Sequence, residues 1–504
     1  MIEAIGEALV NVFGFPNVLV VLLGVTVSML FGALPGLGGI VILTLSLPII
    51  MAMETKLAMM VFAASIGGIT FGGSISAILL NVPGTVANIA TVFDGHPLAR
   101  QGRAGYALAI SATASALGSV FGYLIFLLLL PVVRSVVFSF GPPEFFLMAL
   151  LGISLIASLT QSEPIKGLIS AGLGFLVAFI GYSPITGDMR FTFDLLYLWD
   201  GVHTGVIAIG IFAVSEMFFL AVKGEELVQQ GDVERPTTQD VLEGIRFVFS
   251  NFFLLIRSAT IGCVVGIIPG VGANVAAFLS YAQGQATSPN RANFGRGAPE
   301  GVLAPEAAND AKDGGALLPT VAFGIPGSAP HAILLVGLLL LGLNPGKELL
   351  TTHQATVFTL VLALIAANVW TSILGLLFAN QLVKITRIRV TLIIPIVLVI
   401  SFVGAFVLRN NLLDAFAVLV FGFIGYGMKK YNYSFITFIL AYVLGEIAEV
   451  SLFQTLLISD TGFLIFVTRP ISLVLTLLIL AALALPLVTP LKRAWQRRQL
   501  PDAP

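Results

Sequence analysis

Charged residues are scarce in this chain. Lys, Arg, Asp and Glu make up 10% of its 504 residues, against roughly 25% in a soluble globular domain, and apolar residues make up 57%. A transmembrane helix needs about 20 mostly apolar residues, so this composition excludes a soluble enzyme and predicts a polytopic α-helical membrane protein. A transmembrane β-barrel is excluded as well, because its strands alternate apolar and polar residues, whereas segments 121–133 and 473–488 are apolar on every face.

Cysteine, net charge and long polar segments are also nearly absent. The single cysteine, Cys263, excludes an internal disulfide, and the net charge of −1 argues against a nucleic-acid partner. No polar stretch is long enough for a soluble solute-binding domain. The first apolar run, 15–34, has neither a basic start nor a cleavage-site pattern, so we expect it to be retained. The segments expected in water are 223–246, 287–313 and 492–504, which hold 21 of the 51 charged residues.

The apolar runs predict about 12 full membrane spans. Four further apolar pieces are shorter, and pieces of about 10–14 residues are typical of re-entrant or half-length helices. These short pieces are 40–53, 273–285, 315–325 and 329–343. The expected spans lie near 15–34, 57–80, 106–130, 145–160, 165–182, 202–222, 247–268, 353–378, 390–408, 412–427, 433–452 and 470–489.

Basic residues in the short loops predict the orientation, because Lys and Arg are retained on the cytoplasmic side. The loops assigned to one side hold 13 Lys and Arg, and those assigned to the other side hold five. The loop 384–389 and the tail 492–498 fall on the basic side, whereas Lys347 and Arg409 fall on the opposite side. The C-terminus and the segment 223–246 are therefore expected in the cytoplasm.

Two Pro-Gly motifs occur twice, in the same order. Residues 32–38 read GALPGLG and residues 266–272 read GIIPGVG. Residues 72–85 read GGSISAILLNVPGT, and residues 314–328 read GGALLPTVAFGIPGS, the same pattern with one insertion. A lone Pro-Gly pair would mean little in a chain with 25 Pro and 52 Gly, but two pairs in one order predict an internal repeat.

The charges indicate that the two repeats are inverted in the membrane. The span 106–130 begins beside basic residues, and its counterpart 353–378 ends beside them, so the two run in opposite directions. Inverted repeats are typical of secondary transporters, whose substrate site lies near the membrane midplane between the repeats. The expected organisation is a first repeat at 1–222, a cytoplasmic linker at 223–246, a second repeat at 247–452, and an extra span with a basic cytoplasmic tail at 453–504.

The four Pro-Gly breaks predict one internal site. Non-helical backbone at membrane depth is tolerated only inside protein or along a wet cavity, the helix N-terminus after a break suits a carboxylate, and unwound carbonyls suit Na⁺. The alternative is that the breaks are interhelical kinks and that the small polar residues aid packing; the paired placement favours a site. The predicted solute- and ion-binding residues are Pro35, Gly36, Gly38, Ser74, Ser76, Asn81, Pro83, Gly84, Thr85, Asn88, Pro269, Gly270, Gly272, Asn274, Thr320, Pro326, Gly327, Ser328 and His331.

The polar stretch 300–315 allows two interpretations. If it is helical, Glu306, Asn309 and Asp310 share one face and are able to bind a cation or a partner. Otherwise it is a solvated loop in which Lys312 is a local counter-ion. The charge pattern alone favours the loop.

With these motifs, the chain resembles the large membrane subunit of the tripartite tricarboxylate transporters, the TctA type, from about residue 20 to residue 450. The resemblance rests on FGALPGLGG, FGGSISAILLNVPGTVANIATVFDGHPLARQGRAGYAL, GIIPGVGANVAAFLSYAQGQ, and FGRGAPEGVLAPEAANDA through FGIPGSAPHAILL. It implies a bacterial inner-membrane symporter that takes up di- or tricarboxylates such as citrate with a cation, expected to be Na⁺, and without a bound cofactor. It also implies a small four-helix membrane subunit and a periplasmic solute-binding protein as partners.

Two other function classes remain open at the level of sequence. One is a passive channel or a scaffold subunit, which counterflow in vesicles distinguishes from a carrier. The other, less favoured, is an intramembrane protease, for which Ser74 is a candidate nucleophile and His203, His331 or His353 a candidate base. Asp188 has no second intramembrane aspartate in a suitable segment, which argues against an aspartyl protease.

Overall fold

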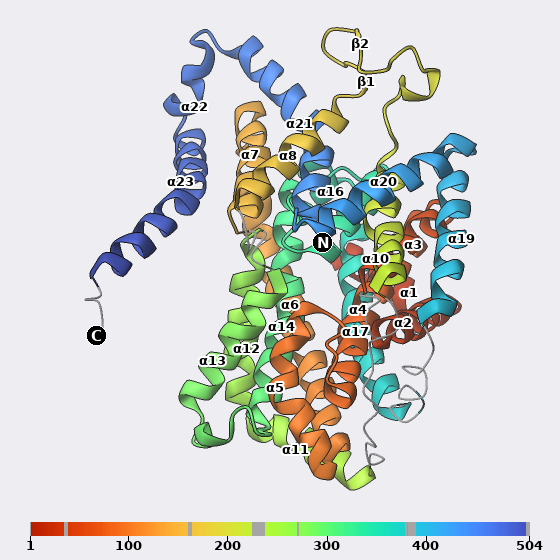
Figure 1. Ribbon diagram of the computed structural model, residues 1–504, viewed down its shortest axis with the longest axis vertical. Coiled ribbons are helices and arrows are strands. Elements are labelled where there is room, and N and C mark those ends of the chain that lie inside the picture. Colours follow the sequence, from red (N-terminus) through yellow and green to blue (C-terminus); the bar gives the residue numbers. More distant parts are fainter. Residues whose placement is uncertain are drawn as a thin grey trace.

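The protein is a bundle of α-helices with one short β-hairpin (Figure 1). A computed structural model describes residues 2–34, 39–159, 164–223, 237–269, 272–378, 381 and 390–499. The antiparallel hairpin pairs β1 (Gly181–Tyr182) with β2 (Met189–Arg190).

The elements of residues 2–223 are α1 (Ile2–Phe13), α2 (Asn17–Ala33), α3 (Ile40–Met51), α4 (Thr55–Leu80), η1 (Val86–Asn88), α5 (Ile89–Leu98), η2 (Ala99–Arg103), α6 (Ala104–Phe138), α7 (Pro142–Leu159), α8 (Pro164–Ala178), the hairpin, η3 (Leu196–Leu198), α9 (Thr204–Ala208), η4 (Ile209–Val214) and α10 (Ser215–Lys223).

The elements of residues 238–499 are α11 (Thr238–Ser250), α12 (Phe252–Ile267), α13 (Gly272–Thr287), η5 (Arg291–Asn293), α14 (Glu300–Phe323), α15 (Ala329–Leu340), α16 (Lys347–Thr351), α17 (Gln354–Leu377), α19 (Val390–Arg409), α20 (Leu412–Lys430), α21 (Phe435–Ile458), η6 (Gly462–Leu464), α22 (Ile465–Thr468) and α23 (Pro470–Gln499).

The prediction of an all-α polytopic membrane protein is confirmed. Within the described ranges, seven helices are long and apolar enough to cross a membrane, or ten if each of three bent helix pairs is one span. The bent pairs are α1 with α2, α11 with α12, and η6–α22 with α23. The two other expected spans, 145–160 and 165–182, coincide with the shorter apolar helices α7 and α8. The short pieces 40–53, 273–285 and 329–343 form α3, α13 and α15.

The two halves of the chain pack through corresponding helix pairs. In each half a helix packs against the long helix that follows it, α2 against α4 and α12 against α14; across the halves, α6 packs against α14 and α17 against α4. Small residues allow α6 to approach closely: a Cβ on Gly118 or Gly122 would lie 2.4 Å from the carbonyl oxygen of Ala307 or Ala311. This packing follows the order of the sequence repeat. That the two repeats are inverted across a membrane stays a prediction.

The polar segment 300–315 is a buried helix, so the solvated-loop interpretation is wrong. It forms the first part of α14, and every residue of α14 from Glu300 to Ala322 is buried. The piece 315–325 is likewise not a separate half-length helix, because α14 continues through it to Phe323. The reason is tertiary: α6, α12 and α13 surround α14 and supply the burial that its own weak hydrophobicity does not predict.

A buried carboxylate of the first half holds the loop that leads into α14. Oδ1 of Asp94, in α5, accepts hydrogen bonds from the backbone N–H groups of Gly295, Gly297 and Ala298 at 2.8–2.9 Å. Its Oδ2 accepts the hydroxyl of Tyr281 at 2.8 Å. Asp94 therefore fixes where α14 begins relative to α5 and α13, and with it the position of the polar residues of α14.

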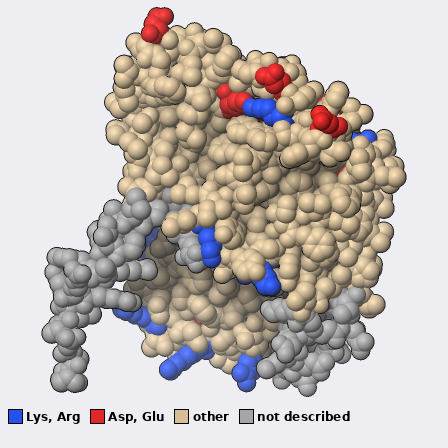
Figure 2. Space-filling view, turned by 45° about the horizontal axis from the view of Figure 1, so that its top comes forward, with Lys and Arg blue, Asp and Glu red and all other residues tan. Residues whose placement is uncertain are grey.

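The two ends of the molecule differ in charge. In Figure 1, α11 lies at the lower end, whereas the hairpin and α22 lie at the upper end. On the face shown in Figure 2, the acidic side chains lie toward the top and most Lys and Arg side chains lie toward the bottom. This is the distribution expected if the lower end is cytoplasmic, which stays a prediction. The expected domain boundaries also stay predictions; the linker segment 224–236 lies outside the described residues, and α11 begins at Thr238.

Candidate functional site

The Pro-Gly segment after α4 is an ordered turn between two helices. α4 ends at Asn81, whose backbone is left-handed with φ of 59°. The N–H of Val82 then donates to the carbonyl of Ser76 at 3.4 Å. Thr85 begins the next helical turn: its hydroxyl and its N–H donate to Oδ1 of Asn88 at 2.6 and 3.1 Å. The helix ends on both sides of this break are therefore capped by local bonds.

The segment after α14 repeats this construction. α14 ends at Gly324, left-handed with φ of 68°, and the N–H of Ile325 donates to the carbonyl of Pro319 at 3.2 Å. Ser328 precedes α15, and its hydroxyl bonds Nδ1 of His331 at 2.9 Å. Each of these residues lies 243 positions after its counterpart in the first break. The sequence repeat is thus also a repeat of backbone conformation and of side-chain pairing.

The glycine of each break is pressed against the helix that precedes it. A Cβ on Gly84 would lie 2.3 Å from Cα of Gly73, and a Cβ on Gly327 would lie 2.6 Å from Cβ of Ala316. Real Cβ atoms do not approach this closely, so only glycine fits either position without displacing backbone. Pro83 and Pro326, directly before these glycines, complete the two tight turns.

The first breaks of each half pack against the second breaks. A Cβ on Gly84 would lie 2.9 Å from the carbonyl oxygen of Gly32, in the last turn of α2. A Cβ on Gly327 would lie 2.7 Å from the carbonyl oxygen of Gly266, in the last turn of α12. Pro269 follows α12 and Gly272 begins α13. The predicted site residues Pro35, Gly36, Gly38 and Gly270, and the side chain of Asn274, lie outside the described part of the chain.

Hydrogen bonds connect the first break to the opposite half of the molecule. The side-chain amide of Asn88 donates to the hydroxyl of Ser74 at 2.8 Å. The hydroxyl of Ser74 in turn contacts both carboxylate oxygens of Glu306, on α14, at 2.8 and 2.9 Å. All three side chains are buried. Of the residues predicted from the break motif, Ser74 therefore bonds a carboxylate of the second half, and Asn88 is linked to that carboxylate through Ser74.

Glu306 is surrounded by hydroxyl groups. Besides Ser74 of α4, it accepts hydrogen bonds from Thr91 of α5, from Ser111 of α6 at 2.9 Å and from Ser115 of α6 at 3.0 Å. Hydrogen bonds to a charged acceptor are worth about 1.5–3 kcal/mol each. Four hydroxyls from three helices therefore stabilise one carboxylate at the contact between the two halves.

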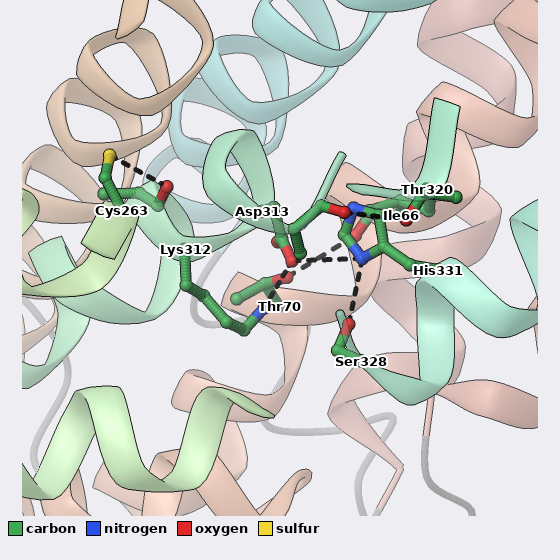
Figure 3. A network of polar contacts seen from close by, with 10 residues as sticks. Ile66, Thr70, Cys263, Lys312, Asp313, Thr320, Ser328 and His331 are labelled. Atoms are coloured by element: carbon green, nitrogen blue, oxygen red, sulfur yellow. Dashed lines mark hydrogen bonds and ion pairs between the residues drawn. The ribbon is translucent and has the colours of Figure 1, made fainter. Parts of the chain in front are cut away.

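The second break is connected to a buried ion pair (Figure 3). Nδ1 of His331, which bonds Ser328, also lies 3.8 Å from Oδ1 of Asp313. The same carboxylate oxygen is paired with the ammonium group of Lys312. Lys312, Asp313 and His331 are each at most 4% exposed. A buried cationic group therefore lies next to the second break, joined to it through Asp313.

Several buried polar atoms near α14 have no hydrogen-bond partner among the described residues. They include both carboxylate oxygens of Asp310, Nδ2 of Asn309, the hydroxyl of Tyr123 and Nε2 of His331. Buried polar groups are normally paired. Three carboxylates, Glu306, Asp310 and Asp313, are opposed here by the single ammonium of Lys312, so the cluster has an excess of negative charge when all four are ionised.

Not every predicted residue takes part in these contacts. The hydroxyl of Ser76 donates to the carbonyl of Gly73 at 3.0 Å, and that of Thr320 donates to the carbonyl of Ala316 at 2.7 Å. Both hydroxyls thus bond the backbone of their own helix. Asn81 is exposed, and its role in the fold is its left-handed backbone.

The sequence analysis missed five residues of this network. Lys312 was assigned to a solvated loop, and Asp313 was given no role. Thr91, Ser111 and Ser115 were not predicted as site residues. One signal was present: Ser111, Ser115 and Ser119 recur every four residues in an otherwise apolar span, which marks one polar face of a helix.

The protease alternative has no support in the geometry of the described residues. The neighbours of Ser74 are Glu306 and Asn88, and neither is a histidine. Ser328, His331 and Asp313 do contact one another, but both contacts of the imidazole use Nδ1. A catalytic triad needs the nucleophile and the carboxylate on opposite nitrogens of the ring.

A cavity of about 460 Å³ lies elsewhere, between α8, α9, α15 and α21. It is lined by polar groups of Thr204, Asn344, Tyr442, Glu446 and Ser451 among apolar residues. None of the residues predicted from the Pro-Gly motifs lines it. The candidate site is therefore defined by the paired breaks and the buried network, and not by this cavity.

Comparisons with known proteins match this chain to a family profile and to related sequences. The sequence profile of the tripartite tricarboxylate transporter TctA family matches residues 18–440. The chain is 30% identical over 483 residues to an uncharacterized 52.8 kDa protein in the TAR-I ttuC' 3' region of Agrobacterium vitis, covering 94% of this chain and 93% of that protein. It is 31% identical over 211 residues to an uncharacterized protein in the TAR-II ttuC' 3' region of the same organism, covering 42% and 87%. No solved structure matches the chain.

Proposed function

Because the chain belongs to the tripartite tricarboxylate transporter TctA family, we propose that it is the large membrane subunit of a secondary active transporter. It imports di- or tricarboxylates of the citrate type across the bacterial inner membrane, driven by a cation gradient, with Na⁺ as the coupling ion. Its partners are a small four-helix membrane subunit and a periplasmic solute-binding protein. The C-terminus lies in the cytoplasm.

One observation carries the proposal: two matching breaks, each with a hydroxyl group at the start of a helical turn, both joined to buried charges on α14. Thr85 and Ser328 occupy the equivalent positions, where a helix N-terminus suits a carboxylate. We place the solute between the two breaks.

We assign part of the charge compensation for the solute to Lys312. The break segments contain no paired arginines, so helix N-termini and the co-transported cation supply the rest of the positive charge. Lys312 is buried beside the second break, and within the described part of the chain its ammonium pairs with Asp313. A solute carboxylate that binds this ammonium beside Asp313 shares its positive charge, so that neither the ammonium nor Asp313 is left as an unpaired buried charge.

Alanine substitutions test the placement of the solute. Thr85→Ala, Asn88→Ala and Ser328→Ala should each weaken the apparent affinity for solute or cation roughly 10- to 150-fold, since a hydrogen bond to a charged group is worth about 1.5–3 kcal/mol. The measurement is uptake by the assembled transporter in vesicles at varied solute and cation concentration. Ser154→Ala, in α7, a helix that contains no break, is the control and should transport normally. Wild-type kinetics and cation dependence in all three variants would show that the site lies elsewhere.

Uptake should also depend on a separate binding protein, because no polar stretch within residues 1–504 is long enough to form a soluble solute-binding domain. Vesicles that hold both membrane subunits should show high-affinity uptake only when the periplasmic binding protein is supplied. Uptake at unchanged affinity without that protein contradicts the proposal. Absence of counterflow in vesicles that do take up solute would instead indicate a passive channel.

A further inference from the structure

Two neighbouring carboxylates on α14 differ in the number of hydrogen-bond donors around them. Glu306 and Asp310 are four residues apart, which places them on one face of the helix, and their side chains are at most 1% exposed. Glu306 accepts four hydroxyl hydrogen bonds. Neither oxygen of Asp310 accepts any from the residues that the structure describes.

Ser115 lies close to both carboxylates. A hydroxyl has one hydrogen, and the hydrogen bond of Ser115 with good geometry is the one to Oε2 of Glu306 at 3.0 Å. With that hydrogen on Glu306, Ser115 presents an oxygen lone pair toward Asp310. A cation between them is able to contact a carboxylate oxygen of Asp310 and the hydroxyl oxygen of Ser115 together.

Among the residues that the structure describes, no basic side chain pairs with Asp310. Lys312 is the one basic side chain of α14, and its ammonium is paired with Asp313. A buried carboxylate without a counter-charge is strongly unfavourable. When the three carboxylates and Lys312 are all ionised, Glu306 and Asp310 are both left without a basic partner among the described residues, and Asp310 also lacks a hydrogen-bond donor.

The donor set indicates the class of ligand. Hydroxyl and carboxylate oxygens are hard ligands, suited to alkali and alkaline-earth cations and not to soft metals. No group of three or more His, Cys, Asp and Glu side chains among the described residues could hold a metal ion, so a cation here is held by two carboxylates at most, with neutral oxygens around it. This favours a single positive charge.

We propose that Glu306 and Asp310, with Ser115 between them, bind one alkali-metal cation of the Na⁺ type. The inference rests on the proposed function, for which it names the site of the coupling ion. Ser74, Thr91 and Ser111 hold Glu306 in place.

The hydrogen bonds also connect this cation site to the first break. Asn88 pairs with Thr85 at the break and donates to Ser74, which contacts Glu306. A change in the position of Glu306 on cation binding is thereby transmitted to the hydroxyl that faces the proposed solute site. Because coupling between two ligands is reciprocal, solute binding strengthens cation binding by the same factor.

Binding of radioactive sodium to the purified full-length chain tests the proposal without any transport assay. The wild-type chain should bind sodium saturably. Asp310→Asn, which removes the charge of Asp310, should weaken binding at least about 100-fold, and Ser115→Ala about 10- to 100-fold, the range for contacts that support a bound metal. Ser119→Ala is the matched control: it lies one turn further along α6, is buried, and bonds the carbonyl of Ala116. It should bind sodium as the wild type does.

The proposal is overturned if Asp310→Asn and Ser115→Ala both bind sodium with wild-type affinity, or if the wild-type chain binds none. It is also overturned if these variants alter only the pH dependence of transport, because the site then takes a proton. Should Asp310→Asn fail to fold, Ser115→Ala decides, since it removes one hydroxyl and leaves every charge in place. Saturable sodium binding that these substitutions weaken, in a transporter that moves no carboxylate, would contradict the proposed function and support this site.

Discussion

Valine in place of Gly84 or Gly327 is expected to abolish transport. A Cβ at these positions would already lie 2.3 Å from Cα of Gly73 or 2.6 Å from Cβ of Ala316, and valine adds two methyl groups to it. Overpacking of this kind costs about 1–3 kcal/mol or more, and here the break has to move away from the preceding helix to relieve it. The atoms that the added side chain would meet belong to the protein itself, at Gly73 for Gly84 and at Ala316 for Gly327.

The measurement is solute uptake in vesicles, with membrane insertion checked by the amount of folded protein recovered. Gly172→Val is a matched control in α8, because an added Cβ at Gly172 meets no atom within 4 Å. It should leave uptake unchanged. Normal transport by Gly84→Val and Gly327→Val would mean that the two breaks do not pack as described.

Replacement of Lys312 by methionine is expected to reduce stability and transport about as strongly as the glycine substitutions do. Breaking a buried ion pair by removal of one partner costs about 3–5 kcal/mol, because the other charge is left uncompensated. Lys312→Met leaves Asp313 buried without its ammonium partner, so both stability and transport should fall. Lys429→Met is the control: Lys429 pairs with Glu216 at a partly exposed position, where an ion pair contributes about 0–1 kcal/mol.

The double variant Lys312→Met with Asp313→Asn separates stability from function. It removes both charges, so the penalty of an unpaired buried carboxylate disappears and thermal stability should recover most of the loss. Transport should stay absent, because the ammonium that we assign to the solute carboxylate is still missing. Recovery of wild-type uptake together with stability would show that Lys312 has only a structural role.

The sequence by itself determined the class of the protein and the position of its breaks. Hydropathy depends on local composition, and a membrane span must satisfy its backbone hydrogen bonds within the helix. Each long apolar run is therefore enough by itself to predict a helix. The break motifs are also local: Asn81 and Gly324 adopt left-handed conformations that these residue types tolerate, and Thr85 and Ser328 pair with side chains three residues away.

Only the tertiary structure decided what surrounds α14. Its composition indicated a solvated loop, and burial came from the helices that pack around it. The hydroxyl partners of Glu306 lie between 191 and 232 positions away in the chain, and no local pattern of the sequence connects positions so far apart. The breaks follow from short-range backbone geometry and were predicted, whereas the charged network arises from long-range packing, which periodicity and composition do not encode.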